Sequence, residues 1–303
     1  MSDERRHHIG GSDIAAICGL SPYESPISVW EQLTGRAAPK EKNLAMRIGT
    51  LAEPMLKTLY EEETGEKLGP AAGLVHPRYP FIEGHPDAGV LGKRKSVETK
   101  TGNIHTAHMW GEPDTDEVPP HYLVQELLYM HLRDDDEGAM AVLLGGNDFR
   151  VYRLHRDHAL EERLVEMAVE FWERYVVPGV PPPPDGSERM SEYLSNRYPK
   201  STARLIESSP QAEALARQLR EAKEAREGWE YIESKAKQQL QVLIGEDRGV
   251  RTEAGMFSYT QRKGDVRVDW KAVEAEIDPE IVRRHTSIGA PYRFPVFRPA
   301  KEK

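Results

Sequence analysis

The sequence predicts an α/β domain, a mixed sheet flanked by helices, followed by an extension made of a long helix and a β-ribbon. Helix-like and strand-like apolar patterns alternate up to about residue 175, which is typical of such a domain. A proline run, VPPPPD at 180–185, then interrupts the pattern. We therefore expect a first domain at 1–178, a proline-rich linker at 179–186 and the extension at 187–303.

Three helices are predicted to precede the sheet. They cover residues 14–20, 27–34 and about 46–64. Ser25 and Pro26 are a favourable cap and first helical residue for the second helix, and Gly65 is a favourable stop for the third. One face of the third helix carries three apolar residues: Leu51, Met55 and Leu59.

Short apolar segments between turn residues predict the strands. They lie at 81–82, 96–101, 139–144 and 149–154, and the last two flank the turn GGND. Further helices are expected at 121–132 and about 158–175. Apolar residues predict the core face of the first of these: Leu123, Leu127 and Met130.

A long helix dominates the predicted extension. Its apolar positions follow a 4-3 spacing over about 34 residues, 211–244, which corresponds to roughly 50 Å of helix. This stripe indicates an antiparallel or coiled-coil contact, and an amphipathic core helix explains it equally well. A two-stranded ribbon is expected at 255–268, then a short helix at 270–277 and a basic, aromatic tail.

The composition indicates a soluble protein. The chain has 303 residues, of which 38% are hydrophobic and 30% charged. No apolar run approaches the roughly 18 residues of a membrane span, and the first residues lack the apolar core of a signal peptide. The single cysteine, Cys18, excludes a disulfide framework and a cysteine-ligated cluster. We expect a cytoplasmic protein without a membrane partner.

The net charge of −9 is unevenly distributed. Residues 1–180 contain 19 Lys and Arg against 30 Asp and Glu, whereas residues 181–303 contain 22 against 20. The acidity of the first part argues against broad basic wrapping of nucleic acid. A polyanionic partner would therefore need a local channel, bound metal ions or contacts from the extension.

Asp87, Glu98 and Lys100 are the strongest candidates for a chemical centre. A turn between two strands would bring Asp87 beside Glu98, and alternation along a strand places Glu98 and Lys100 on one face. Carboxylates bind hard divalent cations, and a lysine can orient or activate water. Together these groups suit hydrolysis of a phosphodiester. Considered by spacing alone, a solvated strand face is the more frequent explanation.

Nearby polar residues could complete such a centre. Glu53 on the third helix offers another carboxylate, and the Thr99 main-chain carbonyl offers another oxygen for a divalent cation such as Mg²⁺. Gln125 and Tyr129 share a helix face, from which Gln125 could touch a phosphate or a bound water and Tyr129 could line the site. Ordinary helix packing also explains this pair.

A basic cluster precedes the first helix: Arg5, Arg6, His7 and His8. An arginine near a helix N-terminus, here around Ser12, is a natural phosphate site. A solvated charged terminus is the competing interpretation. We do not predict a zinc site at the two histidines, because no further ligands follow at a suitable spacing.

Five blocks of the sequence resemble the YqaJ-type viral recombinase family, relatives of phage lambda exonuclease among the restriction-endonuclease-like, PD-(D/E)XK nucleases. In chain order they are IGGSDIAAICGLSPYESPISVWEQLTG, IGTLAEPMLKTLYEEETG, HPDAGV, VETKT and YLVQELLYM. The resemblance covers residues 5–175, and its specificity lies in the order of the blocks. The chain departs from the common motif in that Ala88 and Gly89 follow Asp87.

The resemblance implies a Mg²⁺-dependent exonuclease, with Mn²⁺ as an alternative cation. Such enzymes degrade the 5′ strand of linear double-stranded DNA from an end and leave a 3′ single strand for homologous recombination. By motif, Glu53, Asp87 and Glu98 would bind the metal. The Thr99 carbonyl would add a ligand, and Lys100 would position or activate water.

The resemblance also implies contacts to the DNA and to other proteins. Ser12 falls where the family has a 5′-phosphate contact, and Arg5 or Arg6 falls near its arginine. Gln125 would contact the phosphate or a metal-site water. A ring-like homotrimer, a single-strand annealing protein as partner, and a phage or prophage gene in a bacterial host are further implications.

Two other classes of protein fit the same residues. One is a non-catalytic protein that binds DNA ends or a recombination complex, with the acids as a surface patch. The other is a structure-specific or restriction endonuclease that uses the same metal site. Both nuclease hypotheses need the carboxylates and the lysine, whereas the binding protein does not.

Overall fold

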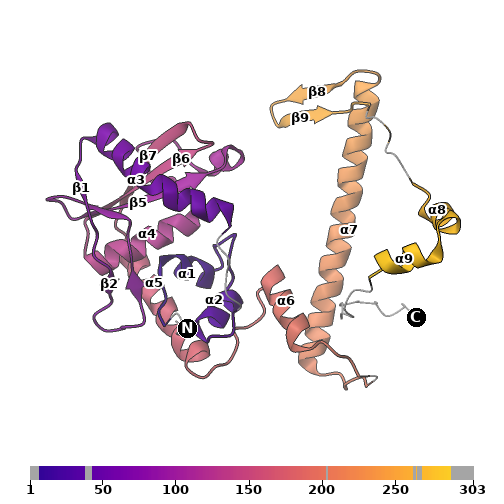
Figure 1. Cartoon of the computed structure of the whole chain (residues 1–303), viewed down its shortest axis with the longest axis horizontal. Coiled ribbons are helices and arrows are strands. Elements are labelled where there is room, and N and C mark those ends of the chain that lie inside the picture. The colour runs from indigo at the N-terminus through magenta and orange to yellow at the C-terminus, as the bar shows by residue number, and fades with distance from the viewer. Residues whose placement is uncertain (1–6, 38–42, 203, 262–263, 265–267, 288–303) are drawn as a thin grey trace. The chain divides into compact units, whose positions relative to one another are not determined.

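The chain divides into two compact units, Met1–Arg197 and Tyr198–Lys303. Figure 1 shows the elements of both units in a computed structural model. The structure describes residues 7–37, 43–202, 204–261, 264 and 268–287.

The elements of the first unit alternate helices and strands, as the sequence predicts. The described helices are α1 (Gly11–Ile17), α2 (Pro26–Leu33), α3 (Leu44–Thr64), η1 (Ile104–Met109), α4 (Pro120–Arg133), α5 (His158–Phe171), the π-helical η2 (Trp172–Val176) and α6 (Glu188–Arg197). The strands are β1 (Leu68–Gly69), β2 (Leu74–Val75), β3 (Glu83–Gly84), β4 (Ala88–Val90), β5 (Lys95–Gly102), β6 (Glu137–Leu144) and β7 (Asp148–His155).

A five-stranded mixed sheet forms the centre of this unit, in the order β1-β4-β5-β6-β7. Strand β5 is antiparallel to β4 and parallel to β6, and β6 and β7 form the predicted hairpin. A parallel pair needs a crossover connection, which here contains α4. This confirms the mixed sheet flanked by helices that a restriction-endonuclease-like core requires.

Helices cover both faces of the sheet. On one face, α1, α2, α4 and α5 share a core with strand residues such as Met140 and Tyr152. On the other face, α3 packs against β5 and β6, where Tyr60 joins Val97 and Ala141. Because successive side chains point to opposite faces, β6 and β7 contribute to both cores. Strand β5 contacts α3 on one side and α4 on the other, so the candidate residues on it lie in a strand that is covered on both faces.

The strand expected at 81–82 is wrong as a partner of β5. Ile82 instead makes an isolated parallel bridge with Ile9, and β4 pairs with β5. The small residues Ala88 and Gly89 face Val97 and Ser96 in that pair. The turn thus begins later than the apolar pattern indicates, and Asp87 comes directly before β4.

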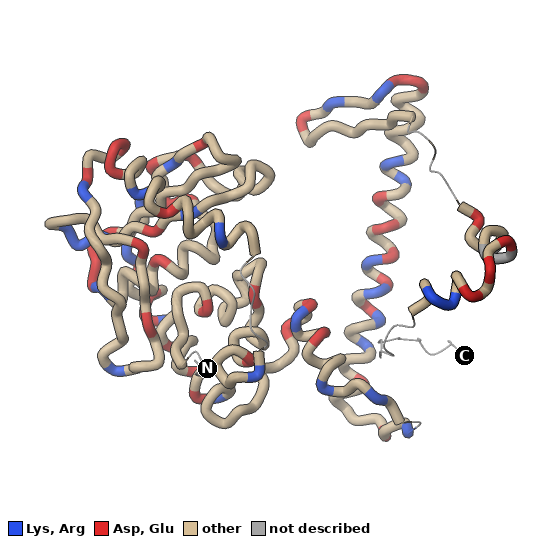
Figure 2. The backbone as a smooth tube through the Cα atoms, viewed as in Figure 1, with Lys and Arg blue, Asp and Glu red and all other residues tan. Residues whose placement is uncertain are grey.

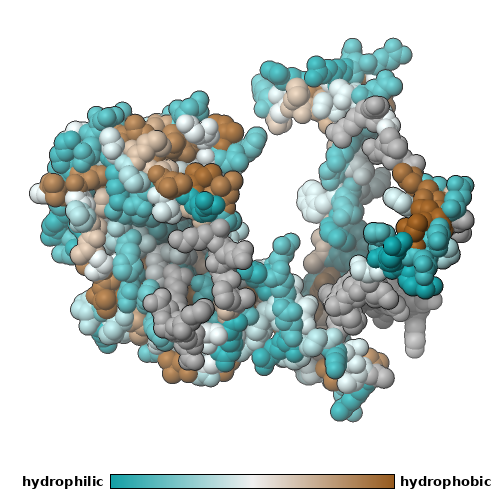
Figure 3. All heavy atoms as spheres, viewed as in Figure 1, coloured by the Kyte–Doolittle hydropathy of each residue, from teal (hydrophilic) through white to brown (hydrophobic). Residues whose placement is uncertain are grey.

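The exposed face of α3 differs from the expectation. Leu51 is 78% exposed and Met55 is also exposed, whereas Leu56 and Tyr60 are buried. Residues 56 and 60 form an i, i+4 stripe of their own, and the Tyr60 hydroxyl donates to Glu66. Periodicity alone did not distinguish these two stripes. Hydrophobic atoms are accordingly visible on the surface of the first unit (Figure 3).

Helix α6 packs with the first unit, although the sequence assigned it to the extension. Met190 is 3% exposed, and the Tyr193 ring meets the Trp30 ring of α2 edge-on at 5.9 Å. The boundary between the compact units therefore lies after α6, beyond the proline run.

The second unit contains the long helix that the sequence predicts. Its described elements are α7 (Pro210–Ile244), β8 (Gly249–Thr252), β9 (Gly255–Ser258), α8 (Trp270–Glu276) and α9 (Pro279–His285). Among the described residues of α7 only Ile244 is buried, so the stripe does not form a core within this unit. Figure 2 shows that both signs of charge alternate along this helix, as in the Arg226–Glu230 pair at 3.5 Å.

The ribbon expected at 255–268 is placed too late. Strands β8 and β9 pair at 249–258, and Thr252 faces Gly255 across a two-residue loop of the kind that favours hairpins. Residues 262, 263, 265–267 and 288–303 lie outside the described residues, so the basic tail is largely outside them as well. Within the described ranges, each helix is too short or too polar to cross a lipid bilayer.

Candidate active site

Glu98 and Lys100 lie on the same face of β5, as alternation along the strand predicts. The Lys100 ammonium donates to Glu98 Oε1 at 2.7 Å. Both side chains are largely buried between the sheet and α4. Burial of an ion pair is costly because each charge loses its hydration. Both groups therefore need further hydrogen-bond or charge partners.

Asp87 is held beside these two residues by Thr99, which lies between them on β5. Its Oδ2 accepts hydrogen bonds from the Thr99 amide at 2.8 Å and from the Thr99 hydroxyl at 2.6 Å. The turn before β4 thus brings the carboxylate of Asp87 to the neighbourhood of Glu98. The predicted convergence of Asp87, Glu98 and Lys100 is present.

Helix α4 completes the cluster through its predicted polar face. Gln125 Nε2 donates to Glu98 Oε1 at 2.6 Å and to the Tyr129 hydroxyl at 3.2 Å. Lys100 Nζ lies 3.3 Å from Gln125 Oε1 and 4.9 Å from the centre of the Tyr122 ring. The glutamine therefore connects the carboxylate, the lysine and the tyrosine in one hydrogen-bonded network.

Burial raises the pKa of Glu98, and the negative charge of Asp87 raises it further, whereas Lys100 lowers it. Its second oxygen, Oε2, is buried and has no hydrogen-bond partner among the described residues. A buried carboxylate oxygen without a partner is costly, and a cation would satisfy it. Together with Asp87, this oxygen gives a donor set of the kind that hard divalent cations such as Mg²⁺ bind.

Sequence reasoning missed Glu126, which follows Gln125 on α4. Its Oε1 accepts a hydrogen bond from Ser96 Oγ at 2.6 Å, and the residue is fully buried. Burial and the nearby charge of Glu98 raise the pKa of Glu126 to about 8. The sequence does offer one signal: Glu126 stands directly before Leu127, on the helix whose core face is predicted from Leu127 and Met130.

Ser12 lies on α1, the helix that packs most closely on α4. A Cβ atom at its neighbour Gly11 would come within 2.6 Å of Gln125 Cγ and 2.8 Å of Tyr129 Cε1. The start of α1 therefore presses on the two polar residues of α4. The Ser12 side chain, which directly follows Gly11, is exposed, and Arg5 and Arg6 lie outside the described residues.

Glu53 is not joined to the centre by any hydrogen bond or ion pair of the described residues. It pairs with Lys57, one turn further along α3, at 2.6 Å. Helix α3 does pack on β5, but from its other face. Similarly, the Thr99 amide and hydroxyl are engaged by Asp87, and its carbonyl stays a proposed ligand.

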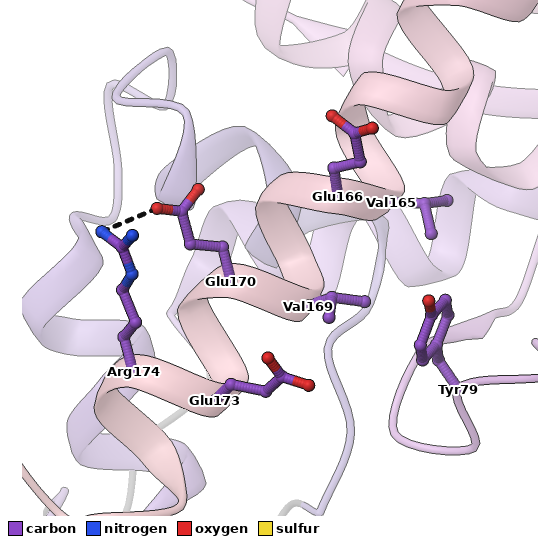
Figure 4. A pocket seen from close by; sticks show the side chains of 7 residues that line it. All are labelled: Tyr79, Val165, Glu166, Val169, Glu170, Glu173 and Arg174. Carbon is purple, nitrogen blue, oxygen red and sulfur yellow. Dashed lines mark ion pairs between the residues drawn. The ribbon is translucent and has the colours of Figure 1, made fainter.

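A separate pocket lies on α5, away from these residues. Its lining is rich in carboxylates and consists of Tyr79, Val165, Glu166, Val169, Glu170, Glu173 and Arg174. In Figure 4 the Arg174 guanidinium reaches Glu170, at 2.8 Å, and the Tyr79 ring faces the two valines. Three acids around one paired arginine disfavour a phosphate ligand, so the pocket adds nothing to the centre on β5.

Comparisons with known proteins confirm the resemblance seen in the sequence. A family model described as the YqaJ-like viral recombinase domain matches residues 2–135, a range that includes the centre. The uncharacterized protein YqaJ of Bacillus subtilis (strain 168) is 32% identical over 199 residues. That match covers 64% of this chain and 61% of the relative.

The solved structures that match parts of this chain include two exonucleases. An alkaline exonuclease from Laribacter hongkongensis, LHK-Exo, matches with a TM-score of 0.47 and 20% identity over 63% of this chain and 96% of its own. A phage-related exonuclease from Haemophilus somnus 129PT matches with a TM-score of 0.43 and 16% identity over 56% and 94%.

Proposed function

We propose that the YqaJ-like viral recombinase domain carried by residues 2–135 is a metal-dependent deoxyribonuclease that degrades the 5′ strand of linear double-stranded DNA from an end. One observation supports this most directly. Glu98 presents a buried, unpartnered oxygen next to Asp87, while Lys100 and Gln125 hold its other oxygen. A buried centre of this kind suits phosphodiester hydrolysis. A non-catalytic binding protein, in which the acids form a surface patch, would not need it.

The side chains of the centre have distinct roles in this proposal. Asp87 and Glu98 hold a divalent cation, Mg²⁺ or Mn²⁺, which when bound would polarise the phosphoryl oxygen and favour ionisation of water. Thr99 fixes Asp87 through its amide and hydroxyl. The Lys100 ammonium orients the attacking water, and its contact with Glu98 limits where that water can lie.

Further residues extend the proposal beyond the hydrogen-bonded cluster. Glu53 and the Thr99 carbonyl are proposed as additional metal ligands on the strength of their positions in the sequence motifs alone. Ser12 and one of Arg5 and Arg6 are proposed to bind the 5′ phosphate. A ring-like homotrimer and a single-strand annealing partner are also part of the proposal, as is a cytoplasmic location in a bacterial host with a phage or prophage origin.

The test is a linear duplex with one labelled 5′-phosphorylated end, incubated with the full chain and Mg²⁺. We expect nucleotide release from that end, leaving a 3′ single strand, and no release with EDTA. Glu98→Gln should lower turnover by at least about 100-fold, as expected when a group that stabilises transition-state charge is lost. Binding of the DNA end should be largely retained.

A matched substitution and two alternative outcomes complete the test. Glu62→Gln, on the exposed side of α3, should leave turnover unchanged. Cleavage of closed circular DNA would support an endonuclease instead. Binding without cleavage, unaltered in Lys100→Ala, would support a non-catalytic DNA-end protein, and near-normal turnover of Glu98→Gln would show that the site is wrongly assigned.

A further inference from the structure

A second group of metal-ligating side chains lies apart from the hydrogen-bonded centre. His8 Nδ1 lies 3.3 Å and His85 Nε2 lies 3.5 Å from the same oxygen, Glu83 Oε2. The three ligand atoms all lie within 4.8 Å of one another. Sequence analysis gave His8 no partners, because Glu83 and His85 are distant in the chain; the fold supplies them.

Backbone pairing places these side chains together. The Ile9 amide donates to the Phe81 carbonyl at 2.7 Å, and the Glu83 amide donates to the Ile9 carbonyl at 3.0 Å. Ile9 and Ile82 are fully buried, so this parallel bridge is a rigid base. It fixes His8 and Glu83 as neighbours on adjacent segments.

The exposed His85 ring lies against the backbone at Gly73. A Cβ atom at Gly73 would lie 2.7 Å from its ring atoms Cε1 and Nδ1, so only glycine allows the backbone to approach the ring this closely. The His8 and His85 rings meet edge-on, with centres 6.2 Å apart. Both nitrogens can therefore face Glu83 without a large rearrangement of the backbone.

The two distances to Glu83 match the spacing of ligands around a tetrahedral ion. Zinc bonds of about 2.0–2.1 Å to nitrogen and oxygen imply ligand atoms about 3.4 Å apart along a tetrahedral edge. The distances of 3.3 and 3.5 Å to Glu83 Oε2 lie on either side of that value. Two imidazoles and one carboxylate are also a recurrent zinc ligand set, which leaves a fourth position for water.

We propose that His8, Glu83 and His85 bind a borderline-soft divalent cation of the Zn²⁺ class, at a site separate from the proposed Mg²⁺ centre. Imidazole ligands favour Zn²⁺ and Co²⁺, whereas Mg²⁺ prefers oxygen ligands. The ion ties the segment before α1 to β3. It thereby fixes the approach of Gly11 to α4, so its role is structural and it does not depend on the proposed nuclease activity.

Co²⁺ is the probe, because tetrahedral Co²⁺ absorbs visible light and takes the same ligands as Zn²⁺. The full chain, treated with EDTA and returned to excess Mg²⁺, is titrated with Co²⁺ while absorbance is recorded. We expect one equivalent to produce a tetrahedral spectrum that Zn²⁺ abolishes. His8→Ala, Glu83→Gln and His85→Ala should each weaken binding about tenfold or more.

Two controls separate this site from the rest of the chain. His155→Ala removes an exposed histidine of β7, and Asp87→Asn removes a proposed Mg²⁺ ligand; both should keep the spectrum. The His85 side chain is 65% exposed, so His85→Ala should fold normally, as circular dichroism can verify. Zn²⁺ should raise the melting temperature of the wild type and not that of His85→Ala.

Two results would overturn the proposal. If His8→Ala and His85→Ala bind Co²⁺ as the wild type does, these residues form ion pairs only. If Asp87→Asn abolishes the spectrum while His85→Ala retains it, the cation occupies the centre on β5 instead. Neither result would bear on DNA hydrolysis, which is measured separately with Mg²⁺.

Discussion

Single residues at the centre illustrate what sequence can reveal. Alternation along a strand was enough to place Glu98 and Lys100 on one face, because this periodicity is local. The contact with Gln125 could be suggested only as a face of a helix, since its meeting with Glu98 depends on how α4 crosses the sheet. Glu126 was missed for the same reason, because burial of an acid is a tertiary property.

Gly11 offers a sharp test of this network at the residue scale. Gly11→Ala would insert a methyl group 2.6 Å from Gln125 Cγ, so Gln125 must shift, which disturbs its hydrogen bond to Glu98. Misplacement of a positioning group by about 1 Å can lower turnover by about 100-fold. We expect Mg²⁺-dependent nucleotide release to fall by about 10- to 100-fold, measured as kcat on the labelled duplex.

The control for Gly11→Ala is the same substitution in open space. Gly228 lies within α7, and a Cβ atom there would meet nothing within 4 Å. Gly228→Ala should therefore leave kcat unchanged and favour the helix slightly. Wild-type turnover of Gly11→Ala would contradict the proposed role of the α1–α4 contact.

Whole elements were predicted better than the contacts between them. Helix ends followed local chemistry: Asn43 caps α3 through the Met46 amide, and Gly65 ends it in a left-handed conformation. The buried face of α3 did not follow from periodicity, since two apolar stripes competed. The strand that pairs with β5 starts later than expected, after Asp87, for a similar reason, because Ile82 pairs with Ile9, far away in sequence.

Glu66 joins the end of α3 to the start of β5, and its loss should weaken that junction. Its carboxylate accepts hydrogen bonds from Lys93 at 2.7 Å, from Lys95 at 3.0 Å and from the Tyr60 hydroxyl. Burial opposes the charge, but these partners outweigh it and lower the pKa of Glu66 to about 2. The lowered pKa means that the folded state holds the charged form more strongly than the unfolded state does.

The sign of the pH dependence follows from this lowered pKa. The contribution of Glu66 is fully present above its unfolded pKa and is lost as the pH falls towards about 2. Glu66→Gln should thus lower the free energy of unfolding by about 1–3 kcal/mol at pH 7, the usual size for hydrogen bonds to a charged group. Urea unfolding at pH 7 and pH 3 should show a smaller difference at pH 3. Equal differences at both pH values, or a comparable effect of Glu62→Gln, would contradict this role.

At the scale of the whole molecule, the position of the boundary between units has a direct consequence. The buried hydrophobic residues described in the structure belong to the first unit, apart from Ile244. That unit therefore has the core it needs to fold without the extension. The proline run predicts a domain end before α6. A change in amino-acid composition, however, does not reveal which neighbouring element an amphipathic helix covers.

Two truncated chains test this boundary. Residues 1–197 should unfold in one cooperative thermal transition and retain Mg²⁺-dependent cleavage, because α1 to α6 and the centre are intact. Residues 1–186 lack α6, which exposes the surface that Met190 and Tyr193 cover on α2. Loss of a buried methionine alone costs about 2–5 kcal/mol, so the shorter chain should melt several degrees lower. Met190→Ala within 1–197 should reproduce part of that decrease. Equal melting temperatures of the two truncated chains would place the boundary at the proline run instead.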